Sequence, residues 1–482
     1  MHLSQLKWSQ SKWRRRGLLF GLGFLLIIGL TQWHITSGLD PNPSLKPLPQ
    51  DPYIQVYFNH SEANVYSEPY RGIERLGDNL EQLLIETIDQ AQSSIDLAVQ
   101  ELGLPKLAQA LRDRRQAGVQ IRVILENQYN RPWSHLSSSE IKALSGRDRN
   151  KYEEFRQLAD QDHNGQLSST EMAQGDALQI LQNAQIPILD DTADGSKGSG
   201  LMHHKFMLVD NRYVITGSAN FTTSGVHGDG LAPDSRGNAN ALLKIDSPAL
   251  AELFNQEFNL MWGDGPEGQK NSLFGLQKPY RTAGQVNLPG STIELQFSPT
   301  SSQIPWSQSV NGAIAKALSK ATQTIDLALF VFSDQTLSNQ LAQKAEAGLQ
   351  IRALLDPGFA YRNYSEGLDM LGLAIPDRRC QYESGNQPWR RPILSVGTSQ
   401  LAKGDKLHHK FALIDDATVI IGSQNWSNAA NQKNDENLLV IHNPTVATHF
   451  RREFDRLYRT ANLGITPKLQ KKIQQQRQKC GR

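Results

Sequence analysis

Apolar residues in this chain fall into short runs that alternate with helical segments, and the arrangement occurs twice. Residues 94–126 (SIDLAVQELGLPKLAQALRDRRQAGVQIRVILE) match residues 324–356 (TIDLALFVFSDQTLSNQLAQKAEAGLQIRALLD) without gaps. Each copy reads as an apolar strand, a helix, a turn at a glycine (Gly118 or Gly348) and a second apolar strand. Apolar strands separated by helices are typical of a sheet covered on both faces. The pattern predicts an α/β fold with an internal repeat.

The elements that flank these segments are also repeated. A strand is expected at 54–58 and again at 293–297. A helix is expected from Ser247-Pro248 to Trp262 and from Asn443-Pro444 to Tyr458, because Ser or Asn at the N-cap followed by Pro is a start signal. We therefore predict two similar α/β/α sandwich lobes, residues 53–264 and 290–460, with the active site at their interface. Residues 265–289 would link them.

The N-terminus has the pattern of an export or anchor signal. Basic residues, ending in Arg14–Arg16, precede the uncharged run Gly17–Leu30. A positive flank before an apolar stretch keeps the N-terminus in the cytoplasm and sends the downstream chain across the membrane. The run is short for a span of about 20 residues and no A-x-A site comes after it, so an uncleaved anchor and a cleaved signal peptide both stay open. We expect an apolar helix within residues 1–38 and a body outside the cytoplasm, membrane-anchored or else secreted or periplasmic.

Residues 39–52 read LDPNPSLKPLPQDP, and their five prolines favour an extended linker. The whole chain has 50 Lys and Arg against 48 Asp and Glu, a net charge of +2. This balance excludes a chain-wide basic field for nucleic acid, although a local basic groove remains compatible with it. The chain has only two cysteines, Cys380 and Cys480, and this low number excludes a disulfide scaffold and a Cys-rich metal site. Whether the two form a disulfide is not readable from the sequence.

Candidate chemistry lies at matching places in the two copies. The first copy carries His203, Lys205 and Asp210 in MHHKFMLVDNRYVITGSANFT, and the second carries His408, Lys410 and Asp415 in LHHKFALIDDATVIIGSQNWS. Both fit H-x-K-x4-D, and both place Gly-Ser seven residues and an Asn ten residues after the Asp, at Asn220 and Asn425. In a strand the first His and the Lys share one face, whereas His204 and His409 point the other way.

This doubled motif resembles that of the phospholipase D superfamily, and the resemblance covers most of residues 53–460. It implies a phosphodiesterase with two histidines flanking one phosphorus. By the resemblance we assign His203 as the nucleophile, which forms a phosphohistidine, and His408 as the acid; the symmetry of the sequence alone does not decide the order. Lys205, Lys410, Asn220 and Asn425 would hold the non-bridging oxygens. Neither a metal nor an organic cofactor is required for this chemistry.

The imidazoles need orienting partners, and the two copies differ there. Glu436 lies 28 residues after His408, where relatives place an acidic residue that bonds a catalytic His. The corresponding residue of the first copy is Asn240, so one histidine alone gains a carboxylate that favours its charged form. The alternative for Glu436 is a solvated surface position. We count the motif aspartates Asp210 and Asp415 with the site, although we expect them to fix a local turn.

A calcium loop is predicted within the first lobe. Residues 160–171, DQDHNGQLSSTE, follow the EF-hand pattern, with Gly165 at the sharp turn and helical spacing on both sides. His203 follows Gly118 by 85 positions, whereas His408 follows Gly348 by 60, which fits a helix–loop–helix insert at about 149–184 in the first lobe. A degenerate polar loop is the alternative. The expected Ca²⁺ ligands are Asp160, Asp162, Asn164, Gln166 (through its carbonyl) and Glu171.

The leading functional prediction is hydrolysis of phospholipid head-group phosphodiester bonds at a membrane surface. The alternatives are a metal-independent endonuclease of the same superfamily, a phosphatidyl transferase of the cardiolipin synthase kind, and a non-enzymatic calcium-binding surface protein. Residues 461–482 form a basic tail that would contact anionic lipid or nucleic acid or, as we favour, be solvated and disordered.

Overall fold

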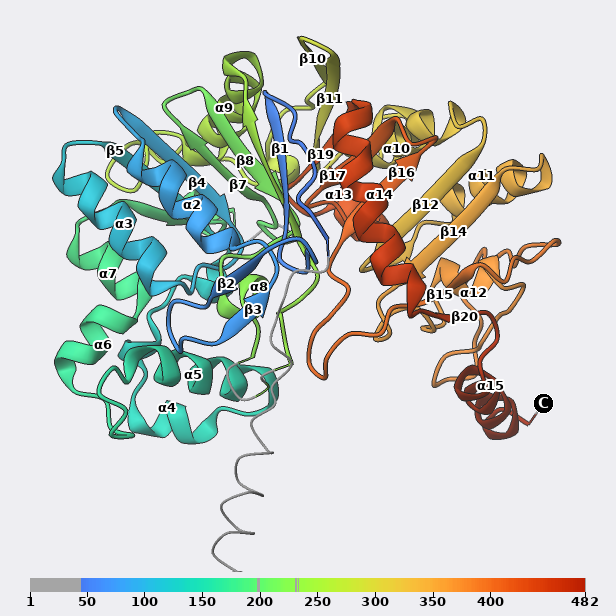
Figure 1. Cartoon of the computed structure of the whole chain (residues 1–482), viewed down its shortest axis with the longest axis horizontal. Helices are drawn as coiled ribbons and strands as arrows, with labels where there is room; N and C mark the ends of the chain where they lie inside the picture. The colour runs from blue at the N-terminus through green and yellow to red at the C-terminus, as the bar shows by residue number, and fades with distance from the viewer. Residues whose placement is uncertain (1–44, 197–199, 230–231, 233, 482) are drawn as a thin grey trace, which may run out of the picture. The chain divides into compact units, whose positions relative to one another are not determined.

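The fold is mixed α/β and contains two large sheets (Figure 1). The structure is a computed structural model, and it describes residues 45–196, 200–229, 232 and 234–481. The predicted N-terminal apolar helix (residues 1–38) and the beginning of the Pro-rich linker lie outside these residues. Within the described ranges, no helix has the length and apolar character needed to cross a membrane.

The first sheet has seven strands in the order β1-β9-β8-β7-β4-β5-β6. Strands β4, β5 and β6 are parallel to one another, and the remaining neighbours are antiparallel. We call β1 through α9 the first lobe. The strands are β1 (Ile54–Phe58), β4 (Ser94–Val99), β5 (Gln120–Leu125), β6 (Ile188–Asp190), β7 (Lys205–Val209), β8 (Tyr213–Gly217) and β9 (Ala241–Asp246).

The second sheet repeats this order and is extended at both edges, as β10-β11-β19-β17-β16-β12-β14-β15-β20. We call β10 through β20 the second lobe. Its strands are β10 (Gly284–Leu288), β11 (Ser291–Ser298), β12 (Thr324–Leu329), β14 (Gln350–Leu355), β15 (Val396–Thr398), β16 (Lys410–Ile414), β17 (Thr418–Gly422), β19 (Glu436–His442) and β20 (Asn462–Leu463). Two small sheets pair β2 (Val65–Ser67) with β3 (Glu74–Leu76) and β13 (Phe332–Ser333) with β18 (Trp426–Ser427).

Helices pack on both faces of each sheet, as the fully apolar strands predict. Those of the first lobe are α2 (Leu80–Asp89), α3 (Pro105–Gln116), α4 (Ser138–Ala143), α5 (Gly146–Ala159), α6 (Ser169–Gly175), α7 (Ala177–Asn183), α8 (Thr223–Val226) and α9 (Pro248–Trp262). Those of the second are α10 (Val310–Ser319), α11 (Gln335–Glu346), α12 (Glu366–Met370), α13 (Asn428–Gln432) and α14 (Pro444–Arg459), and α15 (Pro467–Lys479) follows β20.

A central apolar cluster joins the two sheets. It contains Phe206 of β7 and Phe411 of β16, together with Phe254 of α9 and Phe450 of α14. The next residue along β7, Met207, belongs instead to the cluster that packs against α2, α3 and α7. This alternation follows from the two-residue period of a strand, and helices α9 and α14 pack their apolar faces into the central cluster. The central cluster fixes the two lobes against each other and so determines the geometry of their junction.

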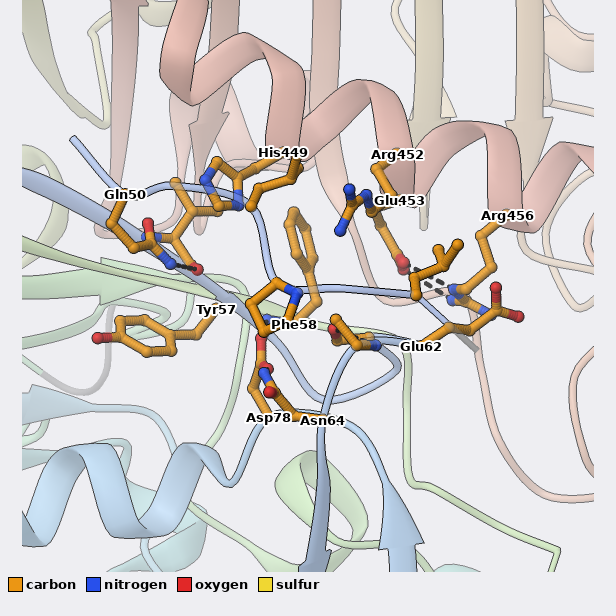
Figure 2. A pocket seen from close by; sticks show the side chains of 16 residues that line it. Gln50, Tyr57, Phe58, Glu62, Asn64, Asp78, His449, Arg452, Glu453 and Arg456 are labelled. Atoms are coloured by element: carbon orange, nitrogen blue, oxygen red, sulfur yellow. Dashed lines mark hydrogen bonds and ion pairs between the residues drawn. The ribbon is translucent and has the colours of Figure 1, made fainter. Parts of the chain in front are cut away.

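The described part of the Pro-rich linker is folded back on the second lobe instead of serving as a free spacer. The carbonyl of Pro49 accepts a hydrogen bond from His449 Nε2 at 3.1 Å, and Asn443 Nδ2 donates to Asp51 at 2.8 Å. The linker and α14 enclose a small cavity of about 80 Å³, and His449 and Arg456 of α14 line its far side (Figure 2). The linker, which precedes the first lobe in sequence, is thus hydrogen-bonded to the second lobe.

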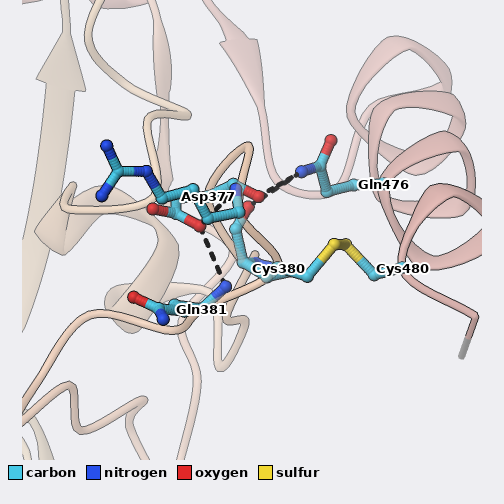
Figure 3. The surroundings of a disulfide bond; sticks show 7 residues. Asp377, Cys380, Gln381, Gln476 and Cys480 are labelled. Atoms are coloured by element: carbon cyan, nitrogen blue, oxygen red, sulfur yellow. Dashed lines mark hydrogen bonds between the residues drawn. A yellow bond between two sulfur atoms is a disulfide. The ribbon is translucent and has the colours of Figure 1, made fainter.

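Two further segments differ from the sequence prediction. Residues 265–289, predicted as a linker, include β10, which pairs with β11 at the edge of the second sheet. The basic C-terminal tail is not an irregular chain, because residues 467–479 form helix α15. A disulfide between Cys380 and Cys480 and hydrogen bonds from Gln476 Nε2 to two backbone carbonyls tie this helix to the second lobe (Figure 3). The helix escaped prediction because the helical spacing in the tail is nearly all polar.

Candidate active site

The two His–Lys pairs lie at equivalent positions, where strands β7 and β16 begin. Lys205 and Lys410 are the first residues of these strands, and His203 and His408 stand two residues earlier on the same face. The side chains at His204 and His409 point to the other face, as predicted, where each contacts a buried glutamate. His203 is 7% exposed and His408 is 9% exposed, so both are buried but reach the surface.

The backbone around each histidine is bonded to the opposite lobe. The N–H of His203 donates to the carbonyl of Asp435 at 3.0 Å, and the N–H of His408 donates to the carbonyl of Ala239 at 3.1 Å. Isolated bridges between Met202 and Asp435 and between Ala239 and Leu407 complete the two crossings. Each catalytic candidate is therefore positioned by both lobes, and the site exists at their junction.

The carboxylate that orients one imidazole also comes from the opposite lobe. Glu436, the first residue of β19, accepts a hydrogen bond from His203 at 2.7 Å between Oε2 and Nδ1. Its other oxygen accepts from Asn434 Nδ2 at 3.0 Å. Glu436 is fully buried, so the surface alternative for this residue is wrong. A carboxylate at Nδ1 holds the imidazole with Nε2 facing the site and stabilises positive charge on the ring.

His408 receives an amide in place of a carboxylate. Its Nδ1 lies 3.0 Å from Oδ1 of Asn240. The orientation of this amide is fixed by its own contacts, because Nδ2 donates to the carbonyl of Gly225 and Oδ1 accepts from Ser218 Oγ, both at 2.8 Å. Nδ1 of His408 is therefore the donor, and in the neutral ring Nε2 carries the lone pair. The sequence indicated that Asn240 replaces the acid but not that the partners cross between lobes.

The lysines and asparagines complete the site, with one difference between the halves. Lys205 Nζ donates to the carbonyl of His203 at 2.8 Å and to Gln100 Oε1 at 3.4 Å, and Asn220 Nδ2 donates to the same Gln100 oxygen at 3.4 Å. In the second lobe the position of Gln100 is taken by Phe330, whose ring centroid lies 4.9 Å from Lys410 Nζ. The sequence analysis missed both residues, although the aligned repeat places them one residue beyond equivalent strands.

Two amide oxygens in the site, Oδ1 of Asn220 and Oδ1 of Asn425, are buried without a hydrogen-bond partner among the described residues. Buried polar atoms are nearly always paired in folded proteins. The same amide oxygen is thus left without a partner at equivalent positions of the two repeats.

Burial and the clustered cations change the protonation of the site. Burial lowers the pKa of His203 to about 4, and Glu436 opposes that change. Burial, followed by the charges of Lys410 and Lys205, lowers the pKa of His408 well below its usual value. Burial also lowers the pKa of Lys205 to about 7. Both rings are thus neutral at pH 7 in the ligand-free site, and an anion between them would raise each of these pKa values.

The motif aspartates lie at the far ends of the strands that begin with the lysines. The carboxylate of Asp210 accepts hydrogen bonds from the backbone N–H groups of residues 92, 93 and 94 at 2.7 to 3.0 Å. Asp415 accepts the equivalent bonds from residues 322, 323 and 324 at 2.7 to 2.8 Å. A full strand of five residues separates each aspartate from the start of its motif, so neither aspartate reaches the reacting centre.

The predicted calcium ligands lie between the end of α5 and the first turn of α6, which contains Glu171. Carboxylate oxygens of Asp160, Asp162 and Glu171 are all within 4.8 Å of one another. Gly165 adopts a φ of +77°, as the sharp turn of such a loop requires, and Asn164 Oδ1 accepts from the N–H of Gln166 at 2.7 Å. The oxygen donors and their spacing fit a hard cation such as Ca²⁺.

A match to known families covers most of both lobes. The family described as "Cardiolipin synthase, PLD-like domain" matches residues 84–262 and 314–458. The mitochondrial cardiolipin hydrolase of Homo sapiens is 25% identical over 194 residues, which is 40% of this chain and 69% of that protein. That of Xenopus laevis is 27% identical over 187 residues, or 38% and 78%.

The fold also matches a solved structure along most of its length. The crystal structure of phosphatidylserine synthase from Haemophilus influenzae Rd KW20 covers 88% of this chain and 90% of its own, with a TM-score of 0.50 and 12% sequence identity. At that identity the likeness concerns the fold alone. The two-part family match carries the assignment: this chain belongs to the cardiolipin synthase family of PLD-like domains.

Proposed function

We propose that this protein is a phospholipase D-type phosphodiesterase that hydrolyses the head-group phosphodiester bond of phospholipids through a phosphohistidine. The observation that carries the proposal is the crossed pairing at the lobe junction. Glu436 and Asn240 each engage the Nδ1 of a histidine from the opposite lobe. Two imidazoles oriented through Nδ1 present two Nε2 atoms, as needed for a nucleophile and a proton donor on either side of one phosphorus.

In the first step Nε2 of His203 attacks phosphorus, and the bond from phosphorus to the head-group oxygen breaks. The attack leaves positive charge on the ring of His203, and the buried carboxylate of Glu436 at Nδ1 stabilises it. His408 in its protonated form gives the Nε2 proton to the departing alkoxide. The bound phosphodiester anion supplies the negative charge that allows His408 to be protonated beside two lysines.

In the second step His408 is neutral and acts as a base. Its Nε2 takes a proton from water, the water oxygen attacks phosphorus, and the bond from phosphorus to His203 breaks. The products are the head-group alcohol and a phosphomonoester lipid, and both histidines return to their starting states. Lys205 and Asn220, which share Gln100 Oε1, and their counterparts Lys410 and Asn425 would hold the non-bridging oxygens throughout.

The printed names of the relatives support a phospholipid as the substrate, since one group is cardiolipin hydrolases and the matched family is named for cardiolipin synthase. A phosphatidyl transferase differs from this scheme only in the acceptor, because an alcohol replaces water in the second step. The metal-independent nuclease alternative retains the same chemistry on a nucleic acid, and no described feature favours it over lipid.

The test uses the body from residue 45 onward beside its His203→Ala variant. Head-group release is measured from vesicles of phosphatidylglycerol and cardiolipin in EDTA, with glycerol added in a parallel series and plasmid nicking as a third assay. We expect release that the variant abolishes. New phosphatidyl products that rise with glycerol would assign a transferase, and nicking without release would assign a nuclease. Release that persists in the variant would refute the proposal.

We also propose that the loop of residues 160–171 binds Ca²⁺ as a structural ion. The carboxylates of Asp160, Asp162 and Glu171 support this role, and a single loop of this kind would bind with a Kd on the order of 10⁻⁴–10⁻³ M. Calcium should raise the Tm of the wild-type body, whereas Glu171→Gln should not respond and Mg²⁺ should have little effect. An equal rise in Tm with calcium in the variant would show that this loop is not the calcium-binding site.

The disulfide supports the predicted location outside the cytoplasm, because such bonds persist in oxidising compartments and are rare in the cytosol. We propose that the body functions there. In cells that express the full chain, thiols are blocked before lysis, and a maleimide that adds mass is applied with and without prior reduction. A mass shift that requires reduction is expected, and the absence of any shift after reduction would mean that Cys380 and Cys480 were free thiols, as in a reducing compartment.

A further inference from the structure

The largest cavity described in this structure lies between the inserted helices of the first lobe and the edge of the candidate active site. It has a volume of about 460 Å³, within the range of small-molecule sites. One wall is formed by residues 101–103 and by Thr222, and the opposite wall by α5 and the start of α7. In Figure 1, helices α4, α5 and α6 lie together below α8, on the side of the first lobe away from α9.

The cavity wall is continuous with the segments that hold the phosphate-binding candidates. Glu101 follows Gln100, the residue bonded to Lys205 and Asn220, and the negative charge of Glu101 raises the pKa of Lys205. The segment of Asn220 is attached to the same wall, since the N–H of Phe221 donates to the carbonyl of Glu101 at 3.1 Å. A molecule in the cavity would therefore lie next to a phosphodiester held by Lys205.

Both apolar and charged side chains line the cavity. Leu102, Phe155 and Leu178 line it and are each at most 5% exposed. Charged side chains line it as well: Glu101 and Lys151 form an ion pair with side chains only 12% and 14% exposed, whereas Arg131 and Arg147 are 52% and 66% exposed. Apolar side chains beside an ion pair and exposed arginines suit a molecule with a hydrocarbon part and a polar part.

The second lobe has no equivalent of this cavity wall among its described residues. Helices α4 to α7 fall in the longer of the two connections, and the shorter connection of the second lobe carries α12 instead. The cavity therefore makes the two halves of the site different, because it lies on the side of His203 and Lys205. This side is where the phosphatidyl group would stay attached while the head group departs toward His408.

We infer that this cavity is a binding site for one acyl chain of the phospholipid substrate, so that the inserted helices select lipids by their hydrocarbon part. The inference rests on the proposed phospholipid activity. A cavity of this volume takes part of one chain, and up to about fourfold in kcat/KM is expected for each methylene that becomes buried in it.

The test fills the cavity by substitution and varies the length of the acyl chain of the substrate. Leu158→Trp on α5 and Leu144→Trp after α4 place extra volume in it, and Lys142→Trp, exposed on α4 outside the cavity, is the matched control. Rates are measured on dibutyroyl and dihexanoyl phosphatidylglycerol below their micelle concentrations and on bis(p-nitrophenyl) phosphate, which has no chain. We expect wild type and Lys142→Trp to prefer the longer chain and both filled variants to lose that preference, with p-nitrophenol release within about twofold of wild type.

A second measurement does not depend on turnover. Trp133 lines the cavity, so lipid with a dibrominated acyl chain should quench its fluorescence in the His203→Ala protein, and Trp133→Phe should remove that quenching. Unchanged chain preference in the filled variants, or quenching that survives Trp133→Phe, would overturn the inference. Absence of any phosphodiester cleavage would overturn the proposed function instead, and the quenching result would still decide whether the cavity holds a chain.

Discussion

The two lobes carry the same His–Lys–Asn set on equivalent strands, yet they surround it differently. His203 faces a buried carboxylate and Lys205 a glutamine, whereas His408 faces an amide and Lys410 the ring of Phe330. The surroundings of the first pair favour a cation on the ring. Both rings are neutral without a ligand, but only His203 has a carboxylate at Nδ1 that stabilises the cation formed during the reaction, whereas His408 has the amide of Asn240. A repeat that is symmetric in sequence motif is thus asymmetric in electrostatics, which supports different roles for the two histidines.

The largest effect is expected from the histidines themselves. His203→Ala and His408→Ala should each lower kcat on phosphatidylglycerol by at least about 10⁴-fold, because each removes an essential group. With bis(p-nitrophenyl) phosphate, whose leaving group needs no proton, His408→Ala should accumulate a phosphorylated protein and His203→Ala should not. Acid-labile phosphate on the protein, located by mass spectrometry, is the measurement. Label on His408 in the His203→Ala variant would reverse the assigned roles.

Removing the groups that orient the two imidazoles should lower kcat by different amounts in the two lobes. Glu436→Gln should lower kcat by roughly 10²- to 10⁴-fold, because the charged form of His203 loses its carboxylate. Asn240→Ala should cost less, about tenfold, since it removes one neutral hydrogen bond. Steady-state rates with Tm measured alongside test this order, and equal losses would mean that the two imidazoles are not functionally distinct.

The pH dependence of kcat/KM should show the lowered pKa of Lys205. The pKa of Lys205 is about 7, so the side chain is charged below that pH and loses its charge as the pH rises through it. Since a charged lysine attracts the phosphodiester, kcat/KM should fall above about pH 7. Lys205→Arg should extend the profile to higher pH at a lower maximum, because arginine keeps its charge. An alkaline limb at the same pH in the variant would assign that limb to another group.

A smaller effect is expected at the residue that differs beside each lysine. Gln100→Leu should lower kcat/KM by about three- to tenfold, because Lys205 and Asn220 lose a shared hydrogen-bond acceptor. Phe330→Leu, its counterpart, removes a ring and no hydrogen bond, and the loss should be smaller. A larger loss at Phe330 would show that the ring contact, and not the amide, positions the lysine.

The smallest effect on turnover is expected at Asp210 and Asp415, which make equivalent hydrogen bonds in the two lobes. Asp210→Asn and Asp415→Asn should leave kcat within about twofold, while each lowers the free energy of unfolding by about 1–2 kcal/mol through weakened bonds to three backbone N–H groups. Asparagine is chosen because both positions have a positive φ, which it tolerates. Chemical denaturation gives the energies, and a loss of kcat without a loss of stability would contradict a purely structural role.

Local pattern predicted much of this architecture. The strands at 54–58 and 94–99 and the Pro-started helices α9 and α14 lie where the sequence placed them, because periodicity and capping are local signals. The crossing of Glu436 to His203 was beyond the sequence, since it depends on how two lobes dock. Gln100 was missed because nothing in its own neighbourhood marks it. The helix at the C-terminus depends on a disulfide and on contacts with residues a hundred positions earlier.

The crossed pairing also has a consequence for synthesis of the protein. Glu436 follows His203 by 233 residues, so a growing chain can complete the first lobe long before its histidine meets a carboxylate. Until nearly all of the polypeptide has emerged and folded, the nucleophile has no partner for its charge and the opposing proton donor does not exist. An unfinished or truncated chain would therefore lack the proposed activity, which requires the last strands to join the second sheet.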